Sequence, residues 1–430
     1  MVNGGTMKEF YTISEVADML SVSKETLRRW DKNGKLTPVR HPMNNYRAYT
    51  SESLKVFEQL GFLFVKEERE APEEPHRNFN MVELFAGAGG LALGMEMAGL
   101  KCKLLNEIDH WPCETLRKNR PQWNVVEQDV SKLDFTPFHG EIDVVTGGFP
   151  CQSFSYAGKK LGLQDARGTL FYEFARAVQE IQPLIAIGEN VRGLVSHEEG
   201  RTLAGMVSIL DEIGYDVLTP QVLKAIHYQV PQKRERLFLV ALKRGSGIYF
   251  DYPKPFKEIY SIKDALKAGR LYPTDVPASH GQGYPKRKKE ILEMVPPGGY
   301  WRDLPVKIQK EYMLKSYYLG GGKTGMARRI SWDEPSLTLT CSPAQKQTER
   351  CHPEETRPFT VREYARIQTF PDDWEFAGPM GAQYKQIGNA VPVNLAYHVG
   401  TELVRALNEY HRTELCKHPE RFAKLEYAVA

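Results

Sequence analysis

The feature of the sequence that most constrains the fold is a series of short apolar runs that begins near residue 80, each closed by glycine or polar residues. Apolar runs of roughly four to eight residues between turn residues are typical of buried strands. Because helical patterns separate these runs, we expect βαβ units, a parallel sheet and an α/β fold. The expected strands are Met81 to Phe85, Cys102 to Leu105, Val144 to Thr146, Leu184 to Ile187 and Leu237 to Val240.

A separate helical unit is expected in residues 1–65. Thr12 precedes an amphipathic helix, and after a Ser-Val-Ser turn a second helix over 24–32 presents Arg28 and Arg29 to solvent. Residues 44–49, which include Arg47, have the character of a β-wing, and a closing helix follows over 51–62. This order predicts a winged helix–turn–helix; a folded appendage packed on the main domain is the alternative.

Composition changes divide the rest of the chain. Five glutamates and two prolines mark residues 66–79 as an exposed acidic linker. The α/β pattern covers 80–244, is lost between 245 and 355, and returns over 356–430, ending in a long helix. Residues 251–350 carry 18 Lys and Arg against 11 Asp and Glu, although the whole chain of 430 residues has a net charge of only +3. The local excess indicates a polyanion-binding segment.

The cysteines and the apolar runs exclude several classes of protein. None of the six cysteines is paired at CxxC spacing, which argues against a zinc site or a disulfide framework, and we expect no metal. No run approaches the roughly 18 apolar residues of a membrane span, and the N-terminus lacks a secretory signal. We expect a cytoplasmic protein that does not enter membranes.

Three successive strand ends carry residues suited to a nucleoside. The first strand leads into a turn with Gly87, Gly89 and Gly90, where backbone N–H groups can approach a ligand. Glu107 ends the second strand, where an acid can accept hydrogen bonds from ribose hydroxyls, and Asp129 follows the third. Together the three positions predict an adenosine-containing cofactor.

The next strand ends carry a nucleophile and a carboxylate. Cys151 lies in a proline-held polar loop, where a thiolate can act as a nucleophile. Glu189 ends the neighbouring strand, so the two side chains are expected to meet in the crevice at the carboxyl edge of the sheet. Arg234 and Arg236 add a basic pair on one face ahead of the last strand.

Nine motifs now stand in one order: FAGAGG, NEID, QDV, GGFPCQSFS, RGTLF, GENV, QKRER, RPFTVREYARIQTFPDDW and QIGNAVP. In this order they resemble the DNA (cytosine-5) methyltransferases of bacterial restriction–modification systems over nearly all of 80–410. The N-terminal stretches TISEVADMLSVSKETLRRW and NYRAYT resemble MerR-type winged helix–turn–helix domains.

The resemblance implies a Rossmann-like methyltransferase fold, a smaller irregular target-recognition domain in 245–355, and S-adenosylmethionine as the cofactor. Glu107 would hold its ribose and Asp129 its adenine amino group. The other implied cofactor residues are Phe85, Gly87, Gly89, Gly90, Ile108, Val130, Pro150, Leu170 and Asn389.

The resemblance also implies a covalent mechanism on a flipped-out cytosine. Cys151 would add to C6, Glu189 would protonate N3, and Arg236 would support that carboxylate, with Arg234 structural or on the phosphate. The expected DNA contacts are Gln152, Ser155, Gln232, Arg328, Arg329 and Thr338, together with Arg28, Arg29 and Arg47 of the N-terminal unit.

The predicted function is methylation of one cytosine in a short sequence of double-stranded DNA by a monomer. Whether a cognate endonuclease acts separately stays open, as does the recognition sequence. A transfer-RNA cytosine-5 methyltransferase is one alternative, and a regulator that binds its own promoter through residues 1–65 is another. An adenine or N4-cytosine methyltransferase is disfavoured, because the chain has no Asp/Asn-Pro-Pro-Tyr/Trp motif and Cys151 would be idle.

Overall fold

The computed structural model describes residues 9–20, 22–43, 45–64, 70–150, 169–320 and 322–417. The chain forms two compact units, one of residues 1–71 with 254–257 and one of 72–253 with 258–430. Among the described residues, no helix combines the length and the apolar character that crossing a bilayer would require.

The N-terminal unit combines short helices with a small antiparallel sheet in the strand order β1-β3-β2. Thr12 caps the first helix, accepting a hydrogen bond from the Glu15 N–H while the Glu15 carboxylate accepts one from the Thr12 N–H. Ser23 caps the second helix through the Thr26 N–H. Its elements are β1 (Phe10–Thr12), α1 (Ile13–Leu20), α2 (Lys24–Lys32), β2 (Val39–Arg40), β3 (Arg47–Thr50), α3 (Ser51–Leu54) and the 3-10 helix η1 (Glu58–Leu63).

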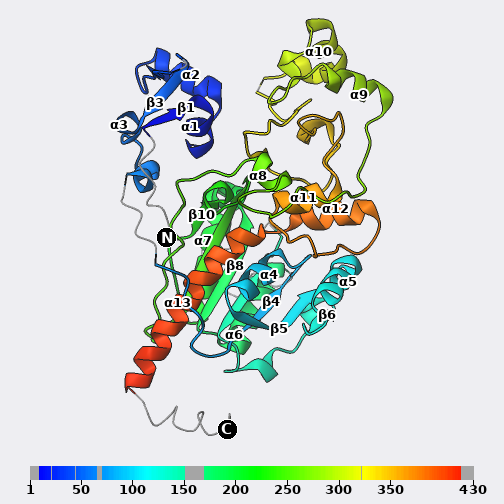
Figure 1. The fold of residues 1–430 in the computed structure, drawn as a ribbon. Helices are drawn as coiled ribbons and strands as arrows, with labels where there is room; N and C mark the ends of the chain where they lie inside the picture. The colour runs from blue at the N-terminus through cyan, green and yellow to red at the C-terminus, as the bar shows by residue number, and fades with distance from the viewer. Residues whose placement is uncertain are drawn as a thin grey trace. The chain divides into compact units, whose positions relative to one another are not determined.

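The second unit is built on an eight-stranded sheet in the order β10-β12-β8-β7-β4-β5-β6, with β9 paired to β12 (Figure 1). Strands β6, β5, β4, β7 and β8 are parallel, as expected for βαβ units. The strands are β4 (Phe79–Leu84), β5 (Leu100–Glu107), β6 (Val125–Glu127), β7 (Val144–Gly147), β8 (Ile185–Val191), β9 (Tyr215–Val217), β10 (Gln221–Lys224) and β12 (Glu235–Lys243).

The expectation of a wholly parallel sheet is wrong at one edge, because β12 is antiparallel to β8. Strand β12 follows β10 after a connection of residues 225–234 that contains no α-helix. A connection this short joins antiparallel neighbours, so β12 runs opposite to the strands before it. The register places Phe238 opposite Glu189 and Arg236 opposite Val191. Arg236 therefore lies two residues from the partner of Glu189 and on the same face of the sheet.

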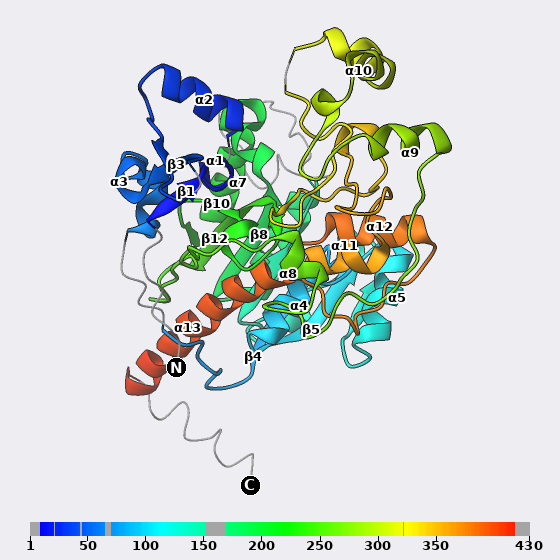
Figure 2. The ribbon, with the colours of Figure 1, turned by 45° about the horizontal axis from the view of Figure 1, so that its top comes forward.

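Helices cover both faces of the sheet (Figures 1 and 2). On one face, α6 (Leu170–Ile181) and α7 (Arg201–Glu212) pack through Phe174, Val178 and Ile209. On the other, α4 (Gly90–Met97) and the long α13 (Val393–Lys417) pack through side chains such as Met95 and Leu403. The other helices of this unit outside the irregular segment are α5 (His110–Asn119), α11 (Val361–Ile367) and α12 (Met380–Asn389).

The irregular segment has a small apolar core of its own, built around Trp301, Tyr312 and Met313. It is joined to the sheet region by a two-stranded parallel pair in which Gln232 of β11 lies opposite Ser336 of β13. Its elements are α8 (Ile262–Leu266), α9 (Lys286–Glu293), α10 (Val306–Met313), the 3-10 helix η8 (Leu314–Tyr318) and β13 (Ser336–Leu337); β11 is Gln232–Lys233.

The end of the acidic segment is fixed to α13 rather than freely extended. Asn408, which is fully buried, donates from Nδ2 to Glu73 Oε2 and to the Glu74 carbonyl, both at 3.0 Å. Its Oδ1 accepts the His76 N–H at 2.9 Å. Residues 72–78, which precede the first strand β4, therefore belong to the second unit.

The close approach of α4 and α13 depends on Gly94. A Cβ at this position would lie 2.4 Å from Ala396 Cβ and 2.6 Å from the Val393 carbonyl oxygen. We expect Gly94→Ala to destabilise the second unit by about 1–3 kcal/mol, because the helices would have to move apart. Thermal unfolding checks this, with Gly381→Ala in α12 as the control, since an added methyl group there meets nothing within 4 Å. Equal midpoints for the two variants would contradict the packing account.

Candidate active site

The glycine turn after β4 is bonded to the acid at the end of β5. The Gly87 N–H donates to Glu107 Oε2, and the N–H groups of Ile108 and Asp109 donate to Glu107 Oε1, each at 2.8 Å. Phe85, which directly follows β4, has a left-handed φ of 58°, a conformation that costs a non-glycine residue about 1 kcal/mol. The strained turn and the carboxylate are thus held together at one edge of the sheet.

Asn106 connects this turn to the third strand end, a role that the sequence did not reveal. It is buried, and its Nδ2 donates to the Val126 and Gln128 carbonyls at 3.2 and 2.8 Å. Asp129 follows directly; its Oδ1 accepts the Ser131 N–H and hydroxyl at 3.0 and 2.8 Å, and these bonds lower the pKa of its exposed carboxyl group. The Asp129 carboxylate is therefore held as an anion.

The other predicted cofactor residues lie around these strand ends. Leu170 begins α6, and Asn389 ends α12 with its Oδ1 accepting from the Cys341 thiol at 3.0 Å. Ile108 is 68% exposed beside Glu107, whereas Val130 is buried below Asp129. Pro150 is exposed in the loop that follows β7. The exposed apolar side chain of Ile108, next to Glu107, is of the kind that can pack against the face of a nucleotide base.

The loop after β7 is tied to β8 at its beginning. Asn190 is buried, and its Nδ2 donates to the Phe149 carbonyl at 2.8 Å. Phe149 packs against Phe171 and Phe174, with ring centroids 5.2 and 5.5 Å away. The chain is therefore fixed two residues before Cys151. Cys151, Gln152 and Ser155 themselves lie outside the described residues.

Glu189 and Arg236 form a buried ion pair beside this loop. Arg236 Nε lies 2.7 Å from Glu189 Oε1, and both side chains are 10% exposed. The other carboxylate oxygen faces Gly148, where an added Cβ would lie 3.2 Å from it. Burial raises the pKa of Glu189, and the guanidinium groups of Arg236 and Arg234 limit that rise. The carboxyl group thus favours a proton more than an exposed glutamate does, next to the loop that leads to Cys151.

Arg234 and Gln232 are used inside the protein. Arg234 is 1% exposed and donates from Nη2 to the Gly388 carbonyl at 3.0 Å and from Nη1 to the Leu339 carbonyl at 3.3 Å. Gln232 is fully buried; it donates to Gln368 Oε1 at 2.8 Å and accepts the Leu339 N–H at 2.9 Å. These bonds position the loops around the site, as expected if Arg234 is structural, and the predicted contact of Gln232 with DNA stays a prediction.

Thr338, predicted to contact DNA, is half-buried, and its hydroxyl donates to the Lys233 carbonyl at 2.7 Å. Its oxygen keeps acceptor capacity, so this geometry leaves a further contact available to the side chain. Thr338 thereby joins the irregular segment to Lys233 of β11, next to Arg234.

The basic residues of the irregular segment divide into structural and exposed groups. Arg329 is 4% exposed, and its guanidinium donates to the Val295 and Leu292 carbonyls at 2.7 and 2.8 Å. Both Nη2 contacts of Arg328 with the Glu334 carboxylate measure 2.6 Å. These bonds hold the segment together, and the predicted contact of Arg328 and Arg329 with DNA stays a prediction.

The lysine-rich run at the start of α9 is partly structural as well. Lys288 Nζ lies 2.6 Å from Oε2 of the fully buried Glu349. Arg287 pairs with Glu311 at 2.6 Å. A large part of the positive charge in this run is therefore neutralised by nearby carboxylates.

In the N-terminal unit, the three predicted DNA contacts lie on the surface of α2 and β3. Arg28 and Arg29 are exposed on α2, and Arg28 pairs with Glu25 at 2.5 Å. Arg47 in β3 lies 3.2 Å from the Asp31 carboxylate. Exposed ion pairs of this kind are weak, so both arginines can exchange their partner for a phosphate.

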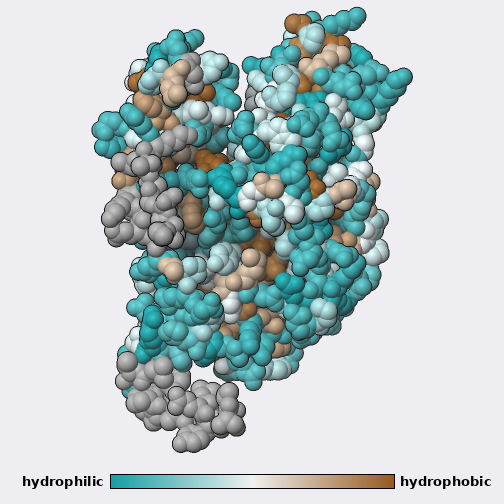
Figure 3. Space-filling view, in the orientation of Figure 1, coloured by the Kyte–Doolittle hydropathy of each residue, from teal (hydrophilic) through white to brown (hydrophobic). Residues whose placement is uncertain are grey.

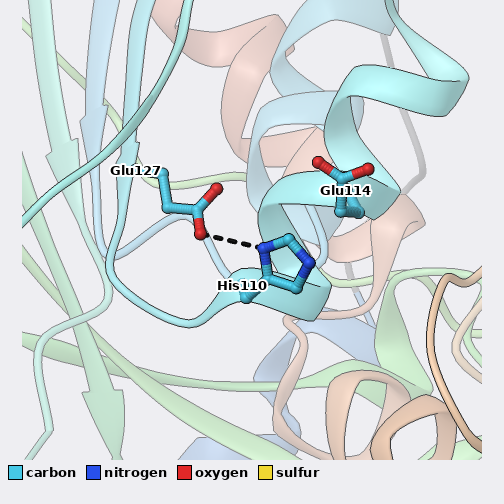
Figure 4. A group of neighbouring side chains, drawn as sticks. All are labelled: His110, Glu114 and Glu127. Carbon is cyan, nitrogen blue, oxygen red and sulfur yellow. Dashed lines mark hydrogen bonds and ion pairs between the residues drawn. The ribbon is translucent and has the colours of Figure 1, made fainter.

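One group of potential metal ligands occurs among the described residues: His110, Glu114 and Glu127 (Figure 4). His110 Nδ1 lies 2.9 Å from Glu127, and Arg117 lies 2.9 Å from Glu114 and 2.7 Å from Glu127. The single Arg117 guanidinium pairs with both carboxylates, so the three side chains form part of an ion-pair network on the surface.

This fold, with a glycine turn bonded to an acid and a carboxylate–arginine pair on one sheet edge, defines an α/β methyltransferase. Residues 79–405 match the C-5 cytosine-specific DNA methylase family, and residues 12–49 match the MerR family regulatory protein. The chain belongs to the C-5 cytosine-specific DNA methylase family. Its reaction is methylation of cytosine in DNA at C5.

Individual relatives agree with this assignment. The chain is 64% identical to the Type II methyltransferase M.Eco47II of Escherichia coli, over 94% of this chain and 98% of that protein. It is 52% identical to the Type II methyltransferase M.Sau96I of Staphylococcus aureus, over 78% of each chain. Among solved structures, a DNA modification methyltransferase assigned to an E. coli prophage is 25% identical with a TM-score of 0.54, covering 77% of this chain and 100% of that one.

The buried pair gives a prediction about pH. In Arg236→Ala the guanidinium that stabilises the Glu189 carboxylate is lost, so the pKa of Glu189 rises further. When folding raises the pKa of a carboxyl group, the free energy of unfolding of the protein decreases as the pH rises above the pKa of that group in the unfolded chain. We therefore expect the loss in unfolding temperature relative to the wild type to be greater at pH 8 than at pH 5, with a cost of about 3–5 kcal/mol at the higher pH.

The double variant Arg236→Ala/Glu189→Gln is the control, because it has no carboxyl group to titrate. Its difference from the wild type should change much less between the two pH values. A deficit of the single variant that is the same at pH 5 and pH 8 would show that the two groups are not coupled.

Proposed function

We propose that the protein transfers a methyl group from S-adenosylmethionine to C5 of a flipped-out cytosine in a short, specific sequence of double-stranded DNA. The observation that carries the proposal is the buried Glu189–Arg236 pair, whose second carboxylate oxygen faces Gly148 at the start of the Cys151 loop. This arrangement supports a proton donor and a thiol nucleophile acting on one base.

The residues at the first three strand ends fit S-adenosylmethionine. Glu107 has an oxygen that already bridges to the Gly87 N–H, so a ribose bound there would lie beside the glycine turn. The anionic Asp129 suits an adenine amino group, and the exposed Ile108 suits the face of the ring. Bound S-adenosylmethionine supplies an electrophilic methyl group.

In the proposed mechanism the Cys151 thiolate adds to C6 of cytosine and forms a C–S bond. The electron pair displaced from the C5–C6 double bond is delocalised towards N3, where Glu189 delivers its proton. C5 thereby becomes enamine-like and accepts the methyl group. A base then removes the C5 proton, the C6–S bond breaks with its electron pair returning to the Cys151 sulfur, and the N3 proton returns to Glu189, which restores the neutral ring. Asn190 and the Phe149 carbonyl hold the start of the nucleophile loop.

The likeness to the Type II methyltransferase of Escherichia coli over nearly its whole length supports a role as the modification enzyme of a restriction–modification system. We propose in addition that the protein acts in the cytoplasm as a monomer. Residues 245–355, with their own core and excess of positive charge, are proposed as the target-recognition domain. A cognate endonuclease would act as a separate protein on the same sequence.

A second activity is favoured for the N-terminal unit, because residues 12–49 match a regulatory protein family and α2 exposes Arg28 and Arg29. We propose that this unit contacts DNA. Footprinting of the protein's own promoter with the wild type and with Arg28→Ala/Arg29→Ala tests it. Protection by the wild type alone is expected, and the absence of a footprint at any salt concentration would exclude promoter binding.

The reaction is tested by bisulfite sequencing of DNA from a host that lacks cytosine methylation. Expression of the wild type should protect cytosines within one short motif, and Cys151→Ser should abolish that protection because a hydroxyl is a far weaker nucleophile than a thiolate. Immunoblotting for soluble protein is the control. Unprotected DNA in both samples, with soluble protein present, would favour the transfer-RNA or regulator alternatives.

A further inference from the structure

The irregular segment ends in an exposed apolar tip at η8. Tyr318 is 76% exposed, Leu319 is 65% exposed and Leu314 is 64% exposed. Figure 3 shows hydrophobic surface among hydrophilic residues in this region, over α10 and η8. Large apolar side chains grouped in this way on a surface indicate a contact with a partner.

Backbone conformation and hydrogen bonds hold the tip in its shape. Leu314, which follows α10 and begins η8, has φ 52° and ψ −135°, a region that is essentially restricted to glycine. The Lys323 ammonium donates to the Ser316 and Leu319 carbonyls, which bracket Tyr318. Tyr317 packs edge-on against Trp301 of the segment's core, with ring centroids 6.0 Å apart. The tip is therefore anchored to the core, and Tyr318 and Leu319 are presented to solvent.

The charges around the tip indicate which class of molecule it binds. Lys307 and Lys310 are exposed on α10, and Lys315 is exposed on η8. The sole carboxylate in residues 306–320 is Glu311, and Arg287 neutralises it at 2.6 Å. A positively charged rim around aromatic and aliphatic side chains is complementary to a nucleic-acid groove, where phosphates flank the bases.

We propose that Tyr318 and Leu319 contact base pairs of the recognition sequence, and that Lys307, Lys310 and Lys315 contact the flanking phosphates. The inference rests on the proposed function, because it names the residues through which that enzyme reads its DNA. Apolar contacts with base edges or base steps discriminate sequences, whereas lysine–phosphate contacts do not. The two groups of residues should therefore have separable effects.

The test uses the purified full-length protein and two sets of oligonucleotides: the methylated motif found by sequencing, and all its single-base-pair variants. Tyr318→Ala and Leu319→Ala should each lower kcat/KM on the motif by roughly 10- to 100-fold. Each should also reduce discrimination at one or two base pairs and leave the KM for S-adenosylmethionine unchanged. Val306→Ala is the matched control, because Val306 is an exposed apolar residue, 59% exposed, at the other end of α10.

The lysine substitutions form the second arm. Lys307→Ala/Lys310→Ala/Lys315→Ala should weaken binding by a similar factor for every sequence and reduce the salt dependence of binding. Because all these side chains are exposed, unfolding is not expected, and thermal unfolding verifies it.

Unchanged discrimination by both tip variants, with kcat/KM within twofold of the wild type, would overturn the inference. So would an equal loss of affinity for all sequences in Tyr318→Ala, or a change from dimer to monomer, since these would indicate a backbone contact or a protein interface. In each case the wild type still methylates its motif, so the proposed function would stand. An inactive wild type would instead contradict that function.

Discussion

The ion pair between Glu189 and Arg236 is the interaction on which the rest of the site depends. Taking a carboxylate and a guanidinium out of water costs several kcal/mol for each ion, and only close contact offsets that cost. Here the two strands supply the contact through their register, because Arg236 lies two residues from the partner of Glu189 on one face. The antiparallel direction of β12 matters for this pair. Because β12 runs opposite to β8, Arg236 near its N-terminal end lies beside the carboxyl end of β8, where Glu189 is.

The same sheet edge joins the two halves of the site. On one side, Glu107 gathers the N–H groups of the glycine turn, and Asn106 links that turn to the loop that carries Asp129. On the other, Asn190 holds the Phe149 carbonyl, and Glu189 faces Gly148. Both halves use a buried asparagine next to a functional acid, so that backbone position and side-chain chemistry come from adjacent residues. A methyl donor and an acceptor base could thereby be brought together on a rigid frame.

Local sequence patterns predicted the strands, the glycine turn and the acids at the strand ends, because each of these depends on residues close together in the chain. They did not reveal side-chain partners that are distant in sequence. Arg329 donates to the carbonyls of Leu292 and Val295, and Gln232 donates to Gln368, none of which the local pattern indicates. Asn106 and Asn190 were missed because an asparagine inside a strand end gives no pattern of its own. The antiparallel edge was missed because strand direction depends on tertiary pairing.

The central claim is that Cys151 forms a covalent bond with a cytosine while Glu189 holds a proton. Mass spectrometry after reaction with DNA that carries 5-fluorocytosine at the target position tests it most directly. The fluorine replaces the C5 hydrogen that must leave in the last step, so the enzyme–DNA bond should persist. The account predicts one DNA strand attached to the peptide that contains Cys151, formed only with S-adenosylmethionine present. Attachment at another cysteine such as Cys341, or no attachment while ordinary DNA is methylated, would contradict it.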